Sequence, residues 1–189
     1  MAVKTFTTGE VLTSADTNTY LANAGLVYIT SVTASSTSSA SINNCFSSTY
    51  DNYRITIAGW NGSTTNYPQG RMRVGGVDKT AADYYYAMSG LYADGASVTS
   101  NGSASTFFEN GMYTNSAGAA ITVGTMDVFA PFKTERTFFL TNATLYAGKF
   151  GFRNGFVEVN DTTSYDGLTI LASAGTFSAV ITVYGYRKA

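Results

Sequence analysis

The chain has 189 residues, of which 44% are hydrophobic, 14% aromatic and only 12% charged, with a formal net charge of -1. This length supports one domain with a small extension. The basic residues are scattered along the chain without forming a stripe, which argues against nucleic acid as a partner.

The first element is an extended arm with one short helix, in residues 1–25. Thr13 or Ser14 supplies an N-cap, and Asp16 completes a capping box whose charge suits the positive end of a helix. Gly25 follows at the position where a left-handed backbone is favoured. A helix of about three turns is too short to be stable alone in water, so we expect it to dock on its own sheets or on a neighbouring chain.

From Leu26 onward the hydrophobic period changes to two, which predicts about nine or ten strands. The strongest alternation places Tyr53, Ile55 and Ile57 on one face of a strand, and Pro131 should end another. For residues 78–119 we expect only two or three short strands between long loops. The other expected strands are 26–33, 40–46, 48–60, 71–77, 120–132, 136–148, 149–160, 166–173 and 175–188.

This pattern predicts an all-β protein, an antiparallel β-sandwich of jelly-roll type with one short helix in an attachment arm. The expected division is an N-terminal arm in residues 1–25 and a sandwich head in residues 26–189.

Few residues suit catalysis or metal binding. The absence of histidine excludes Ser–His and Cys–His nucleophiles and removes the commonest metal ligand. Cys45 is the only cysteine, so no internal disulfide forms, and we expect it to be a small buried core residue. No secretory signal and no apolar run of about 20 residues is found, so we expect neither export by that route nor membrane insertion. We expect no cofactor.

Three polar features leave alternatives open. Asp127 and Glu158 lie within strands and are candidates for a glycosidase pair, although solvent-facing strand carboxylates are the simpler interpretation. Residues 160–167 offer oxygens for calcium but miss the EF-hand spacing, so a polar loop is favoured. Arg71 and Arg73 share one face of a strand. The favoured interpretation is that they are solvated charges at a sheet edge, and the alternative is a phosphate site.

Aromatic residues are numerous enough that some rings remain outside a full core. Flat rings beside Asn, Asp and Thr are typical of sites that stack sugars, so the loop aromatics predict glycan or receptor contact. The alternative is that the same rings pack the sandwich or a subunit interface. The candidates are Trp60, Tyr67, Tyr84, Tyr85, Tyr86, Tyr92 and Tyr113.

Three stretches together resemble small structural proteins of tailed bacteriophages: "FTTGEVLTSADTNTYLAN" near the N-terminus, "FSSTYDNYRITIAG" (46–59) and "ITVYGYRKA" (181–189). Members of this group look like tail-fibre, receptor-binding or capsid-surface proteins. The resemblance implies that the arm attaches to a virion while the middle of the chain faces outward. The attachment residues would be Phe6, Gly9, Val11, Leu12, Asn18, Tyr20 and Leu21.

Three functional hypotheses follow. The first is a non-enzymatic tail-fibre or receptor-binding module, a homo-oligomer with a trimer favoured, which docks on other virion proteins and contacts a host surface glycan. The second is a capsid decoration protein, and the third is a glycan hydrolase. Outside a virion, the same fold would be a sandwich-type lectin. For the virion hypotheses we expect assembly in a bacterial cytoplasm.

Overall fold

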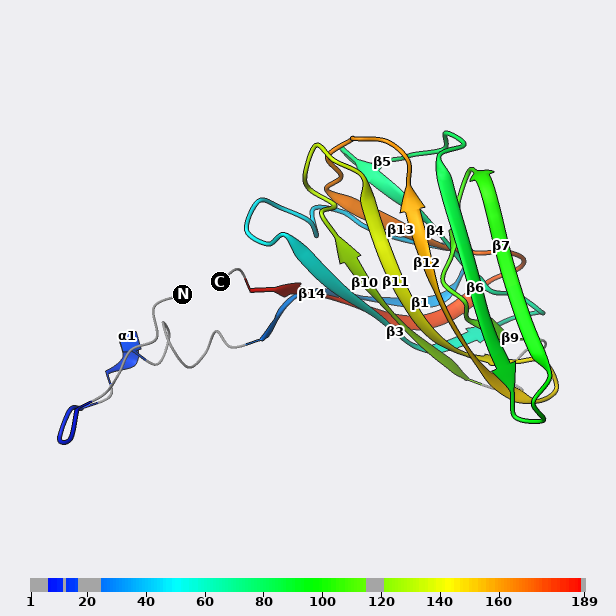
Figure 1. Ribbon diagram of the computed structural model, residues 1–189, viewed down its shortest axis with the longest axis horizontal. Coiled ribbons are helices and arrows are strands. Elements are labelled where there is room, and N and C mark those ends of the chain that lie inside the picture. The colour runs from blue at the N-terminus through cyan, green and yellow to red at the C-terminus, as the bar shows by residue number, and fades with distance from the viewer. Residues whose placement is uncertain (1–6, 12, 17–24, 115–120, 188–189) are drawn as a thin grey trace.

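The computed structural model describes residues 7–11, 13–16, 25–114 and 121–187. Nearly all regular structure in these residues is β-strand, and the strands form two sheets in a sandwich-like arrangement (Figure 1). Apart from one short parallel pair, the strands are paired antiparallel. The prediction of an all-β protein with antiparallel sheets is therefore confirmed.

The larger sheet has nine strands in the order β1-β14-β3-β10-β11-β12-β6-β7, and β9 adds a short parallel pairing to β11. The bounds are β1 (Leu26–Thr37), β14 (Phe177–Tyr186), β3 (Asn52–Gly62), β10 (Thr122–Phe129), β11 (Thr137–Tyr146), β12 (Phe150–Val159), β6 (Tyr84–Tyr92), β7 (Ser97–Ser105) and β9 (Tyr113–Thr114).

The smaller sheet has five strands in the order β2-β13-β4-β5, and β8 also pairs with β4. The bounds are β2 (Ser39–Ile42), β13 (Gly167–Ala172), β4 (Pro68–Val74), β5 (Val77–Asp78) and β8 (Phe108–Glu109).

One hydrophobic core joins the two sheets. Alternate residues of a strand point to the same face, so a strand with one buried face shows apolar residues with period two. In β14, Phe177, Ile181 and Val183 are fully buried, on the face predicted from the alternation. The smaller sheet contributes Met72 and Leu168 to the same cluster. The two sheets therefore stabilise each other by burying one shared set of apolar side chains.

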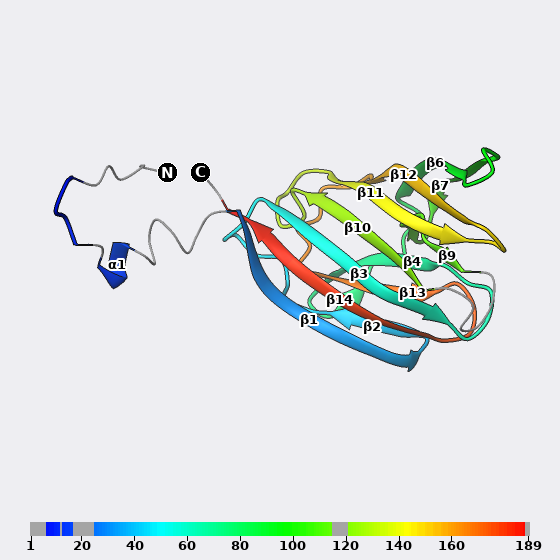
Figure 2. The same ribbon diagram turned by 90° about the horizontal axis from the view of Figure 1, so that it is seen from below.

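The larger sheet has two distinct ends. At one end, the start of β1 lies beside the end of β14. Leu26 pairs with Tyr186, and the Arg187 amide donates to the Gly25 carbonyl at 3.3 Å. We call this the terminal end; it lies at the left of Figure 2, with β9 at the opposite side. The opposite, or far, end carries the chain segments 63–67, 93–96 and 147–149, as the antiparallel pairings require.

Residues 84–105 correct the expectation for the middle of the chain. Instead of short strands, β6 and β7 are nine residues each and pair along most of their length. Gly102 allows this pairing, because a Cβ atom on it would lie 2.4 Å from the Tyr86 ring. Gly90 allows β6 to pair with β12 on its other side, because a Cβ atom there would lie 1.7 Å from the Phe152 carbonyl oxygen. The glycine-rich composition thus reflects close packing, not loops.

The expected N-terminal helix is described only at its start, as one turn over Ser14–Asp16. Gly25 has a φ of +90°, the left-handed backbone predicted there, and the remainder of the expected helix lies in residues 17–24, outside the described residues. Within the described ranges, no helix has the length and apolar character needed to cross a membrane.

Candidate functional site

Three of the seven candidate aromatics are core residues: Trp60, Tyr84 and Tyr86. Trp60 is fully buried, stacks on Phe177 with ring centroids 4.2 Å apart, and donates from Nε1 to Asn66 Oδ1 at 3.0 Å. Tyr84 is also fully buried, and its hydroxyl accepts from the Met72 amide at 2.8 Å. The prediction that these rings contact an external glycan is therefore wrong for Trp60 and Tyr84.

A backbone irregularity explains why Trp60 points inward. The alternation of Tyr53, Ile55 and Ile57 would leave residue 60 on the outer face. The register of β3 shifts against both neighbouring strands just before Trp60, and Gly59 there has a φ of +71°. A bulge inserts one extra residue and exchanges the faces of the residues after it.

Two other candidates, Tyr67 and Tyr113, are brought together at the far end. Their rings are stacked, with centroids 6.4 Å apart and an interplanar angle of 17°, and both side chains are half-buried. The backbone next to the rings fixes this arrangement. Asn66, which precedes Tyr67, and Thr114, which follows Tyr113, exchange two backbone hydrogen bonds of 2.9 Å. Two rings distant in sequence thus form one flat, partly exposed surface.

A carboxylate, that of Glu109, lies near Tyr67 and acts on it electrostatically. Glu109 accepts from the Tyr86 hydroxyl at 3.2 Å and from the Ser100 hydroxyl at 2.6 Å, and it is placed by the pairing of β8 with β4. Burial raises the pKa of Tyr67, and the Glu109 carboxylate raises it further. Burial and the same carboxylate also raise the pKa of Tyr86. Both hydroxyls therefore stay protonated and can donate hydrogen bonds.

We call Tyr67, Tyr86, Glu109 and Tyr113 the tyrosine–glutamate cluster. It combines flat apolar rings with hydroxyl donors and a carboxylate acceptor, the groups that recognise the faces and hydroxyls of a sugar. Tyr86 takes part through its hydroxyl alone, because its side chain is buried. The sequence-based reasoning did not single out Glu109; its signal was a carboxylate directly after two phenylalanines, in "TFFENGMY".

The two remaining aromatic candidates lie elsewhere. Tyr92 is at the far end, where the Lys149 ammonium lies 4.9 Å from its ring centroid and forms an ion pair with Asp94. Together with Phe150, it lines a shallow hollow of about 540 Å³. Tyr85 is half-buried and opposes Glu158 on the outward face of the larger sheet. Among the described residues, neither ring contacts the rings of the cluster.

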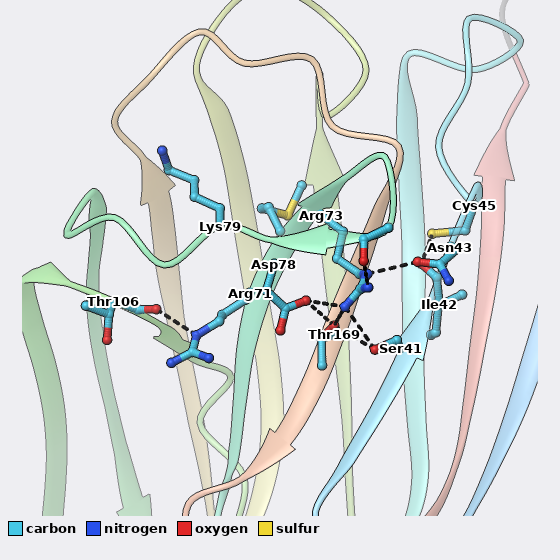
Figure 3. A network of polar contacts seen from close by, with 12 residues as sticks. Ser41, Ile42, Asn43, Cys45, Arg71, Arg73, Asp78, Lys79, Thr106 and Thr169 are labelled. Carbon is cyan, nitrogen blue, oxygen red and sulfur yellow. Dashed lines mark hydrogen bonds and ion pairs between the residues drawn. The ribbon is translucent and has the colours of Figure 1, made fainter.

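The arginines of β4 belong to a polar network on the smaller sheet (Figure 3). Arg73 forms an ion pair with Asp78 and donates to the Thr169 hydroxyl at 2.6 Å and to Asn43 Oδ1 at 2.8 Å. Arg71 donates to the Thr106 carbonyl oxygen at 3.0 Å. The Arg73 guanidinium is largely buried, and its charge is neutralised by Asp78. The network therefore links β4 to β5, to β13 and to the residue after β2.

The other polar candidates also have structural partners. Asp127 receives a bidentate contact from Arg54, at 2.7 and 2.8 Å, and Glu158 accepts from Arg136 at 2.7 Å. In the loop 160–167, Asp161 binds Lys79. Within the residues that the structure describes, no group of three or more potential metal ligands occurs.

Cys45 is buried, as predicted. Desolvation raises the pKa of its thiol to about 12, so the group stays protonated near neutral pH. Its Sγ atom donates weakly to the Ile42 carbonyl at 3.6 Å.

The expected attachment residues fall mostly outside the described residues: Phe6, Leu12, Asn18, Tyr20 and Leu21. Gly9 has a φ of +88° within a turn closed by the Glu10 amide and the Thr7 carbonyl, at 3.0 Å. Val11 is 79% exposed. Exposure of an apolar side chain in this segment is compatible with docking and does not identify a partner.

Comparison of the chain with protein-family models, with curated proteins and with solved structures finds no match.

Proposed function

We propose that the chain is a non-enzymatic structural protein of a tailed bacteriophage, a short tail-fibre or receptor-binding module. Residues 1–25 would dock on other virion proteins, and the far end would contact a host surface glycan. The copies would associate as a homo-oligomer, with a trimer favoured, and the particle would assemble in the host bacterial cytoplasm. The resemblance of three sequence stretches to phage structural proteins motivates the virion assignment.

One observation carries the receptor-binding part of the proposal. The stacked Tyr67 and Tyr113 rings of the tyrosine–glutamate cluster lie at the end of the larger sheet opposite to the pairing of Leu26 with Tyr186. A module held through its N-terminal segment presents its opposite end to the surroundings. A rigid sheet scaffold that positions rings and a carboxylate on loops and short strands is a usual way to build a recognition site.

We further infer a jelly-roll sandwich. β13 and β14 lie in different sheets, and each pairs on one side with an early strand, β2 or β1. On their other sides they pair with β4 and β3. A two-stranded ribbon that passes from one sheet into the other supports this topology.

A capsid decoration protein is the second candidate. The observation that favours it is an exposed apolar face on the larger sheet, since such a face suits tight association within a shell. The hydrolase hypothesis has less support, because Asp127 and Glu158 are each engaged by an arginine.

Localisation on the particle tests the assignment. We expect a label at the C-terminus, imaged on purified particles, to appear at the tail in a few dozen copies or fewer. Hundreds of copies spread over the head would favour the decoration protein instead. Absence of the protein from particles of the phage that encodes it would contradict both virion proposals.

A further inference from the structure

The outward face of the larger sheet carries exposed apolar side chains over β10, β11, β12 and β6, which lie side by side in Figure 1. Six of them are each between 44% and 52% exposed. We call this surface the outer apolar patch: Leu91, Val123, Phe138, Leu140, Phe152 and Phe156.

Strand register makes these side chains neighbours. Leu140 is the partner of Phe156 across β11 and β12, and Phe152 is the partner of Leu91 across β12 and β6. The Val123 amide donates to the Thr144 hydroxyl oxygen at 2.9 Å, which holds Val123 beside β11. A shallow hollow of about 380 Å³ lies on the same face. The patch is therefore one surface and not a set of isolated residues.

The charges around the patch are already neutralised. On the outward face of the described strands of this sheet, the charged side chains are Arg54, Asp127 and Glu158. The first two form a bidentate ion pair with each other, and Glu158 pairs with Arg136. Such a face offers no net charge for an oppositely charged partner to match. A second copy of the same face satisfies this condition, because it is equally neutral.

The area of the patch is of the size that stable association requires. Three phenylalanine rings at about half exposure leave on the order of 300 Å² accessible. The three aliphatic members and the nearby Phe150, which is 58% exposed, bring the total to on the order of 700 Å². Stable interfaces bury about 800 Å² on each partner. Single exposed apolar residues are ordinary, whereas a contiguous patch of this size marks an interaction site.

The centre of the patch holds two uncharged amides. Asn142 and Asn154 are partners across β11 and β12, and both are exposed. An amide group carries donors and acceptors together, so two copies of this pair can hydrogen-bond to each other whichever symmetry brings them together. Apolar side chains around a small polar centre form an interface that is complementary to itself.

We propose that the outer apolar patch is the surface through which copies of this chain associate. The inference deepens the homo-oligomer part of the proposed function and rests on it. A face that packs against itself pairs two copies about a twofold axis, so it gives a dimer in place of the trimer. It does not depend on a glycan ligand or on a virion. Association would bury rings that otherwise contact water.

The test compares the mass in solution of the full wild-type chain with that of two patch variants, Leu140→Asp and Phe156→Asp. A charge placed opposite another copy of itself is desolvated and repelled. We expect the wild type to form an oligomer across the micromolar range by light scattering, and each variant to raise the dissociation constant on the order of 30-fold or more. The matched control is Val77→Asp, which is 67% exposed on the smaller sheet and should keep the wild-type mass.

Three results would overturn the inference: a wild-type chain that stays at 20.0 kDa throughout this range, patch variants that retain the wild-type oligomer, or equal disruption by Val77→Asp. Circular dichroism verifies that the variants keep their strands. If an Asp variant unfolds, Phe156→Ser replaces it, and this variant should also raise the dissociation constant of the oligomer. Glycan binding is measured separately, so that a monomer that binds glycan would refute the interface and leave the receptor proposal intact.

Discussion

Replacing Trp60 with alanine is expected to lower the free energy of unfolding by about 3–5 kcal/mol, the cost of removing a large side chain from a packed core. The ring is fully buried and stacked on Phe177. Its loss also leaves Asn66 Oδ1 without the indole donor, at a position where water has little access. The lost packing and the unpaired Asn66 oxygen both lower the free energy of unfolding.

Chemical denaturation of the full chain measures this effect, with Tyr28→Ala as the control. Tyr28 is 61% exposed on β1, and its truncation should cost about 1 kcal/mol or less. Equal costs for the two variants would contradict the buried position of Trp60. A Trp60→Ala variant of normal stability that fails to bind glycan would restore the sequence-based prediction that this ring contacts a ligand.

The Lys79→Met variant is expected to lose about 2–3 kcal/mol of stability at neutral pH. Lys79 lies between two carboxylates, at 2.7 Å from Asp83 and also in contact with Asp161. Asp161 in turn accepts from the buried Tyr165 hydroxyl at 2.9 Å. Removing the cation leaves two like charges close together, with partial burial that weakens their screening by water. The estimate is below the full value for buried pairs because Asp83 is about one-third exposed.

The pH dependence of this loss follows from the pKa of Asp161. Burial opposes ionisation of this carboxylate, but hydrogen bonds from Lys79 and Tyr165 outweigh it, so its pKa is lowered. A carboxyl with a lowered folded-state pKa stabilises the fold above its unfolded value of about 3.9, and this contribution disappears as pH falls through the folded value. The difference in stability between wild type and Lys79→Met should therefore shrink as pH falls from 7 to below 4. A difference that stays constant over this range would contradict the ion-pair role.

Alternation of apolar residues is enough to predict most of the long strands. Phe177, Ile181 and Val183 show which face of β14 is buried, and residues 71–77 overlap β4. The prediction fails where a strand departs from simple alternation or where glycine replaces a core side chain. The bulge before Trp60 points the Trp60 side chain inward, against the simple alternation. Gly155 interrupts the apolar pattern of β12 because Gly155 packs against Met88.

The candidate site depends on contacts that local sequence patterns do not encode. Tyr67 and Tyr113 were each identified as surface aromatics, but only the long-range pairing of Asn66 with Thr114 brings them together. The outer apolar patch was missed for a related reason. In "TFFLT" both faces of the strand are apolar, so alternation alone does not separate the buried Phe139 from the exposed Leu140.

The most direct test of recognition by the far end is binding of the full chain to an array of bacterial surface glycans. We expect binding to at least one envelope polysaccharide, weakened about tenfold or more in both Tyr67→Ala and Tyr113→Ala, because each variant removes half of the ring stack. Tyr28→Ala, an exposed ring outside the cluster, should bind as the wild type does. Unchanged binding by both cluster variants, or no binding to any glycan by the wild type, would contradict the assignment of the far end as the receptor-contacting surface.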